Sequence, residues 1–291
     1  NLRIVNHFHG VNFKRSVLCQ SQNVEILNVP NDGTGFIIDS TATGTSGFGI
    51  HSLRDIQINA VSGATAATGV RITHTGGTYM DNVSASDCNT GLALTPSSGL
   101  IVEHIFSSRT AWDGGVQGIL VQPTSDATVR RCTFIGDWTA SNSQYGVLIG
   151  GSGTVAGMQF IGHRSYQNGF SGLSIGNGTN FVVQGGTFSG NNTSTSGGHS
   201  GIAVGAVTGV RLLGNRCGAA DGFGASQAYG INISSSLVTN CVVKDNDCTD
   251  NISGAVQIAA GSSATVVDNA GFVTKKRGGA TLAAGTTTVT V

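Results

Sequence analysis

"GILV" at residues 118–121 is a phrase that returns along the chain, as "GVLI" at 146–149, "GLSI" at 172–175, "GIAV" at 201–204 and "GINI" at 230–233. The gaps between the leading glycines are 28, 26, 29 and 29 residues. The phrase also begins at Gly69, Gly91 and Gly254, so its period runs from 22 to 29 residues over most of the chain. Self-similarity at such a period indicates a repeat protein.

The repeating unit is built of strands. A period in the twenties is typical of leucine-rich repeats, helical hairpins or parallel β-coils. No L-x-x-L-x-L frame recurs, and helical hairpins do not suit a chain of 291 residues with 45 glycines and only two glutamates. A second apolar phrase follows the first after a short turn, as in "VRRCTF" from Val129 and "VAGMQF" from Val155. The sequence therefore predicts an all-β fold, a right-handed parallel β-helix of about 9 to 11 coils.

Stacked coils place equivalent side chains in ladders along the helix axis, and the interior accepts ladders of similar apolar shape. We expect one inward ladder made of Phe134, Phe160, Phe188, Cys217 and Cys248. No short-spaced cysteine pair or compact framework is present among the six cysteines, which predicts free thiols in the core.

The charge balance excludes some classes of partner. The chain has 15 basic and 15 acidic residues, and charged residues make up only 10% of it, which gives no electrostatic basis for binding nucleic acid. No apolar run of about 18 residues is present, so no membrane insertion is expected. His7 and His9 have the spacing of metal ligands but no neighbouring partner, and we expect no metal and no cofactor.

The pattern changes near the end of the chain. Residues 1–269 carry the β-helix phrases, whereas 270–291 contain the basic run Lys275–Arg277, a Gly-Gly pair and a final Thr/Val alternation. This predicts the truncated start of a C-terminal β region.

The coil phrases resemble those of the pectate-lyase-like right-handed β-helix superfamily. Residues 271–291, "GFVTKKRGGATLAAGTTTVTV", resemble the junction of many bacteriophage tailspike and tail-fibre proteins, where a β-helix gives way to a C-terminal trimerisation or chaperone domain. This resemblance implies a homotrimeric virion appendage that binds, and often cleaves, a bacterial surface polysaccharide. No catalytic motif of such a protein matches residue by residue.

Aromatic residues fall in the loops before the glycine phrases. Trp112 lies six residues before Gly118, Trp138 eight before Gly146 and Tyr166 six before Gly172. Rings that project from one face at coil spacing suit the apolar faces of pyranose rings, so we expect these three side chains to bind sugar. The alternative is that they cap loops or pack between subunits.

The same loops contain ionisable residues. Asp137, His163 and Asp221 each lie nine residues before their glycine, and Asp113 lies one coil above Asp137. We expect Asp113 and Asp137 to form a catalytic carboxyl pair about 5 to 10 Å apart, a range that leaves retaining and inverting hydrolysis open. His163, Arg164 and Asp221 are expected to bind the next sugar. The alternative for each aspartate is a turn former.

A second group of charges lies on strands of earlier coils, and it consists of Arg54, Asp55, Asp81, Asn82, Glu103, His104, Arg130 and Arg131. Pointing outward, they would form one vertical stripe of alternating sign, with Glu103 as a reserve catalytic acid. The stripe is better explained as a ladder of solvated ion pairs.

Three functions remain open. The first and favoured one is a homotrimeric phage tailspike that binds and depolymerises a capsule, O-antigen or exopolysaccharide, by hydrolysis rather than elimination. The second is an adhesion module that binds glycan without cleaving it, and the third is a secreted polysaccharide lyase or epimerase. The expected location is the virion, with secretion as the alternative.

Overall fold

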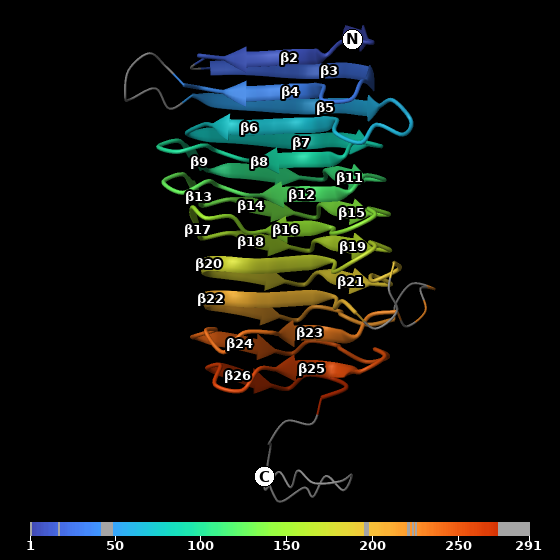
Figure 1. Cartoon of the computed structure of the whole chain (residues 1–291), viewed down its shortest axis with the longest axis vertical. Helices are drawn as coiled ribbons and strands as arrows, with labels where there is room; N and C mark the ends of the chain where they lie inside the picture. The colour runs from blue at the N-terminus through green and yellow to red at the C-terminus, as the bar shows by residue number, and fades with distance from the viewer. Residues whose placement is uncertain are drawn as a thin grey trace, which may run out of the picture.

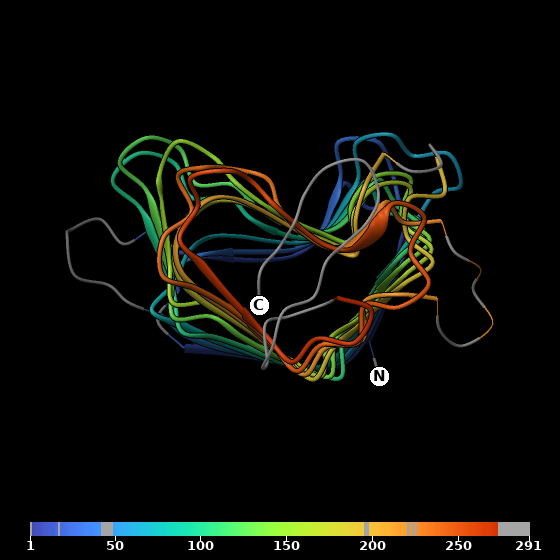
Figure 2. The same ribbon diagram turned by 90° about the horizontal axis from the view of Figure 1, so that it is seen from below.

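The computed structural model describes residues 2–16, 18–41, 49–194, 198–219, 222, 224 and 226–272. They form a parallel β-helix of about nine turns, stacked from β2 at one end to β26 at the other (Figure 1). Seen end-on, the coils superimpose and share the same walls (Figure 2). The predicted fold class is confirmed. Most of the predicted C-terminal region, residues 273–291, lies outside the described residues.

The glycine phrases form the first face of the helix, where each strand pairs in parallel with the equivalent strand of the next coil. Its strands are β2 (His9–Lys14), β4 (Thr34–Asp39), β6 (Thr68–His74), β8 (Thr90–Leu94), β12 (Gln117–Val121), β16 (Val147–Ile149), the beginnings of β20 (Leu173–Gln184) and β22 (Ile202–Leu213), β23 (Tyr229–Ile233) and β25 (Gly254–Ile258). Three short strands lead away from it, namely β9 (Ile101–Glu103), β13 (Thr128–Arg130) and β17 (Thr154–Ala156).

The second apolar phrases form the second face. Its strands are the beginnings of β3 (Leu18–Val29), β5 (Ile50–Ala60) and β7 (Gly77–Ser86), then β10 (Ile105–Ser108), β14 (Thr133–Ile135), β18 (Gln159–Ile161), the ends of β20 and β22, β24 (Cys241–Lys244) and β26 (Ala264–Val267). The third face contains β1 (Leu2–Val5), the ends of β3, β5 and β7, β11 (Ala111–Asp113), β15 (Trp138–Ala140), β19 (Arg164–Tyr166) and β21 (Thr187–Ser189).

The core consists of inward ladders. Phe134 and Phe160 are fully buried, and their rings stack 4.9 Å apart with 6° between the planes. The next coil continues this ladder with Val183, not with Phe188. Phe188 lies on the third face, in the same register as Cys217 and Cys248. The expected single ladder is therefore two ladders on two faces. All six cysteines are free, and all but Cys19 are buried, as the sequence predicted.

Buried amide side chains link successive coils beside the first face. Asn142, Asn168, Asn191, Gln227 and Asn251 form one column in which each NH₂ group donates to the carbonyl oxygen of the next amide, at 2.8 to 3.0 Å. A second column of Asn215, Asn246 and Asn269 is built in the same way. Because every amide both donates and accepts, these buried polar groups are satisfied without water.

The turns between strands use left-handed backbone. One such turn follows β13, and each neighbouring coil has an equivalent turn. The residue with positive φ at this turn differs between successive coils, with φ between 52° and 74°: His104, Arg131, Gly157, Asn180, Gly209 and Asn240. This conformation suits Gly and Asn but costs other residues about 1 to 2 kcal/mol. His104 and Arg131 are therefore exceptions at this turn.

No helix in the described part of the chain is long and apolar enough to cross a membrane.

Candidate functional site

The two tryptophans point in opposite directions. Trp112 pairs with Thr139 of the next coil, whereas Trp138 pairs with Ala111 and Arg164. Trp112 is therefore one register position further along its strand than Trp138. Because side chains alternate between the two faces of a strand, Trp112 points into the core and Trp138 points outward. Trp112 has no exposed surface, whereas 37% of Trp138 is exposed. The expectation that Trp112 binds sugar is therefore wrong.

The predicted catalytic pair is divided by the wall of the helix. Asp137 has no exposed surface and lies in the interior. Asp113 is half-buried at the end of β11 and accepts a hydrogen bond from the Ala140 amide at 2.6 Å. A polymer cannot enter the packed interior, so Asp113 and Asp137 cannot flank one glycosidic bond.

Asp137 occupies a position where the neighbouring coils place Thr110 and His163. Its Oδ1 accepts a hydrogen bond from the Thr110 amide at 3.3 Å. Burial raises the pKa of Asp137 to about 6, and the hydroxyls of Ser107 and Thr110 offset part of that effect.

Replacing Asp137 by Asn is expected to stabilise the protein at pH 7. The pKa of Asp137 is raised from 3.8 in the unfolded chain to about 6 in the folded one. The folded state therefore binds the proton more tightly, and the stabilisation that results is complete below pH 3.8 and is lost as the pH rises through 6. The neutral amide avoids that loss, which amounts to about 3 kcal/mol at pH 7. Urea unfolding at pH 7 and pH 3.5 measures it, with exposed Asp126→Asn as the control. An equal gain at both pH values would contradict the assignment.

His163 is also interior and does not reach the surface where it was expected to bind sugar. Its ring lies between Phe160 and Phe188, with centroids 5.6 and 5.9 Å away, and Nε2 is 3.2 Å from the Thr139 hydroxyl. Nδ1 has no hydrogen-bond partner among the described residues. Burial lowers the pKa of His163 to about 3, so the ring is neutral at physiological pH. Asp221 lies outside the described residues.

Four of the predicted residues do meet on the outside of the third face, and we call them the outer cluster: Asp113, Trp138, Arg164 and Tyr166. The rings of Trp138 and Tyr166 pack edge to face with centroids 5.3 Å apart. Burial raises the pKa of Asp113, although the Ala140 amide and the Trp138 indole both donate hydrogen bonds to its carboxylate. The outer cluster thus combines an exposed indole, a guanidinium and a carboxyl group whose pKa is raised by burial.

The predicted charged stripe is two separate groups. Arg54, Asp81 and Ser108 share one register on the second face, whereas Glu103 and Arg130 share another at its edge. Ion pairs occur in both groups, as the ion-pair interpretation predicted, but they form no single ladder and Glu103 is buried and not solvated.

The Asp81 cluster contains Arg54, Asp81, Ser108 and Arg109. Arg109 donates to both oxygens of Asp81, with distances of 2.6 to 3.0 Å, and the Ser108 hydroxyl donates at 2.9 Å. The bond from Arg109 lowers the pKa of Asp81. Arg109 was not predicted as part of this cluster, because it lies in the turn after β10 and not on a strand.

The charged corner contains Glu103, His104, Arg130 and Arg131. Glu103 is only 8% exposed, and its Oε2 lies 2.7 Å from Nε of Arg130, 3.7 Å from Nη1 of Arg131 and 4.0 Å from Nε2 of His104. One carboxylate therefore faces three basic side chains.

An aromatic step made of Tyr79 and Phe106 lies on the second face. The two residues pair in register on adjacent coils, their ring centroids are 6.2 Å apart, and 54% of Tyr79 and 39% of Phe106 is exposed. Phe106 lies between His104 of the charged corner and Arg109 of the Asp81 cluster. Sequence reasoning missed this pair, although its separation of 27 residues, one coil, is a usable signal.

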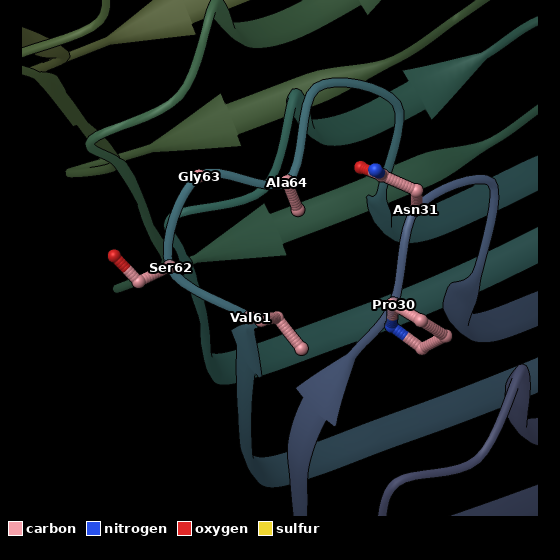
Figure 3. A pocket seen from close by; sticks show the side chains of 6 residues that line it. All are labelled: Pro30, Asn31, Val61, Ser62, Gly63 and Ala64. Carbon is pink, nitrogen blue, oxygen red and sulfur yellow. The ribbon is translucent and has the colours of Figure 1, made fainter.

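A polar hollow of about 270 Å³ lies next to the aromatic step. It is lined by Gln20, Ser21, Gln22, Ser52 and Arg54, and Ser52 pairs in register with Tyr79. Another hollow, of about 360 Å³, opens between the loops after β3 and β5 and is lined by Pro30, Asn31, Val61, Ser62, Gly63 and Ala64 (Figure 3). No side chain that lines it titrates, so it offers no acid–base chemistry.

No group of three or more potential metal ligands occurs in the described ranges, which include His7 and His9.

A family model described as right handed beta helix region matches residues 117–291, more than half of the chain. No curated protein matches. Among solved structures, the periplasmic alginate epimerase AlgG is 10% identical with a TM-score of 0.47, covering 89% of this chain and 74% of that one. The A-module of mannuronan C-5 epimerase AlgE4 from Azotobacter vinelandii is 13% identical, with a TM-score of 0.45 and coverage of 89% and 80%. Tailspike protein 3 of bacteriophage CBA120 is 13% identical, with a TM-score of 0.38 and coverage of 96% and 58%.

Proposed function

We propose that this chain, which belongs to the right-handed β-helix family, binds a bacterial surface polysaccharide as part of a homotrimeric bacteriophage tailspike on the virion. The observation that supports this proposal most directly is the aromatic step between two charged groups on the outer wall. Its two exposed rings lie on adjacent coils and are bordered by guanidinium and carboxylate side chains.

The chemistry of this wall suits a sugar chain. The apolar faces of pyranose rings pack on aromatic rings, while their hydroxyls need hydrogen-bonding groups at the edge of the stack. Tyr79 and Phe106 supply the rings. Arg54 and Ser52, which line the adjacent hollow, supply donors for hydroxyls of the next sugar. Successive coils are roughly 4.8 Å apart, which is close to the length of one sugar unit.

Glycosidic bond cleavage is the second part of the proposal and depends on the outer cluster. We assign Asp113 as the proton donor because burial raises its pKa, although the hydrogen bonds from the Ala140 amide and the Trp138 indole offset part of that effect. Arg164 positions the sugar beside it, whereas Tyr166, which is only 7% exposed, supports the Trp138 ring from below the surface. A glycosidase also needs a second carboxyl group, and Asp113 is the only one in the outer cluster. Binding without cleavage is therefore the competing function, and elimination or epimerisation on the same fold is the other.

Removing the aromatic step is expected to weaken glycan binding. The double variant Tyr79→Ala/Phe106→Ala should lose about tenfold or more in affinity, equivalent to about 1.4 kcal/mol, because both stacking surfaces are lost. The parent is screened against a panel of bacterial capsular, O-antigen and exopolysaccharides, with titration calorimetry for binding.

The matched control is Leu237→Ala, which removes an exposed apolar side chain on a distant coil. Equal affinity of the parent and the double variant would refute the proposed binding wall. Reducing ends and the absorbance of unsaturated uronate, followed in the same samples, separate hydrolysis, elimination and pure binding. Hydrolysis that survives in Asp113→Asn would exclude Asp113 as the donor.

A further inference from the structure

The charged corner has more positive than negative groups. Glu103 is opposed by two guanidinium groups, which leaves one positive charge in excess, and a second when His104 is protonated. Arg130 uses Nε to bind Glu103. Nη1 of Arg131 is 3.7 Å from the same oxygen, beyond hydrogen-bonding distance.

The Arg131 guanidinium is therefore available. No hydrogen bond from its side chain reaches another described residue, and 61% of that side chain is exposed. A guanidinium presents five N–H donors in a planar fork that matches the two oxygens of a carboxylate, or a sulfate or phosphate group. Arg131 thus keeps its N–H donors unbonded although the Glu103 carboxylate lies 3.7 Å away.

The backbone at this corner is left-handed, as it is at other turns of the chain such as Arg15 and Arg109. His104 and Arg131 have φ of 52° and 57°, at a turn where the following coils use Gly157, Asn180 and Gly209. A long side chain in the left-handed region carries a strain that Gly or Asn avoids. At this turn, the residue with positive φ is cationic on the coil that contains Phe106 and on the coil after it, and on no other described coil.

From these observations we infer that the proposed glycan-binding wall is specific for an anionic polysaccharide. A sugar ring packs on Tyr79 and Phe106, and its acidic group binds the Arg131 guanidinium with support from Arg130 and His104. Glu103 holds Arg130 in place. The inference rests on the proposed function and adds the chemical class of the substrate.

The test uses acidic and neutral bacterial capsular polysaccharides, each acidic one also in carboxyl-reduced form, in which every uronate becomes a neutral hexose. Dextran sulfate and dextran serve as probes of charge alone. The expected result is binding of an acidic polysaccharide that falls at least tenfold after carboxyl reduction and weakens as salt rises. Tighter binding of dextran sulfate than of that polysaccharide would also support an anionic ligand, and would identify its acidic group as sulfate.

The variant Arg131→Gly removes the guanidinium and suits the left-handed backbone, so it should fold at least as well as the parent. It should lose affinity for the acidic polysaccharide about tenfold, and Arg131→Lys should recover part of it. Asn240→Gly makes the same backbone change at the same turn four coils away and should leave binding unchanged.

Two failures can be told apart. Binding of a neutral polysaccharide, or unchanged affinity after carboxyl reduction and in Arg131→Gly, would overturn the anionic specificity and leave the proposed function intact. Absence of binding to every acidic and neutral probe would refute the proposed function as well.

Discussion

Lowering the pH from 7 to 4 is expected to destabilise this protein, with the largest histidine contribution from the interior side chain His163 and smaller ones in the same direction from His51 and His199. The pKa of His163 is 6.5 in the unfolded chain and about 3 in the folded one, because the ring is buried between phenylalanines. The unfolded state therefore binds a proton that the folded state cannot accept. The stabilisation is complete above pH 6.5 and is lost as pH falls towards 3, by roughly 5 kcal/mol over the whole window.

Urea unfolding at pH 7, 5 and 4 measures this effect, and His163→Gln should show a much flatter dependence on pH. Exposed His7→Gln is the matched control and should behave as the parent does. Asp137, one coil away, acts in the opposite direction between pH 3.8 and 6, so the full effect of His163 appears in the Asp137→Asn background. If His163→Gln loses stability on acidification as steeply as the parent, the interior placement of His163 is wrong.

The second large effect is expected from the core of the second face. Phe160→Ala removes a ring that stacks on Phe134 and packs above Val183, and the coils cannot close the cavity because each is held in register by its neighbours. The expected loss is about 3 to 5 kcal/mol in the free energy of unfolding. Ile135→Ala, on the outer side of the same sheet, should cost less than about 1 kcal/mol. Equal stability of Phe160→Ala and the parent would place that ring outside the core.

The fold could be predicted from the sequence because the repeat is imposed by stacking. Each coil must present a similar apolar shape to the next, so Gly118, Gly146 and Gly172 return with strand phrases behind them. The direction of individual side chains could not be predicted by counting back from those glycines. The loop between the third face and the next glycine varies in length, so Trp112 and Trp138 were assigned to equivalent positions that they do not have.

Counting forward from the left-handed turn before the third face gives the observed register. Trp112 is the third residue after Arg109, and Thr139 is the third after Gly136. The turn is held by hydrogen bonds to the adjacent coils, whereas the following loop accepts insertions without disturbing the ladders. The candidate site was therefore predicted in part: Asp113, Trp138, Arg164 and Tyr166 do cluster, whereas Tyr79 and Phe106 required the coil-to-coil register.

The buried amide columns have a mechanical consequence. The hydrogen bonds between coils run along the long axis of this fold. A pull along that axis therefore loads every gap between coils with the same force, and the bonds within one gap share it. The amide columns add buried bonds to the gaps from Asn142 to Asn269. In the described first coils, side-chain bonds such as Asn28 to Asn6 and Asn82 to Asp55 are exposed and water competes for each, but the strand pairs β3–β5 and β5–β7 are long. Under axial tension the two parts of the rod therefore resist separation in different ways, the first coils through long backbone ladders and the later coils through buried amide columns.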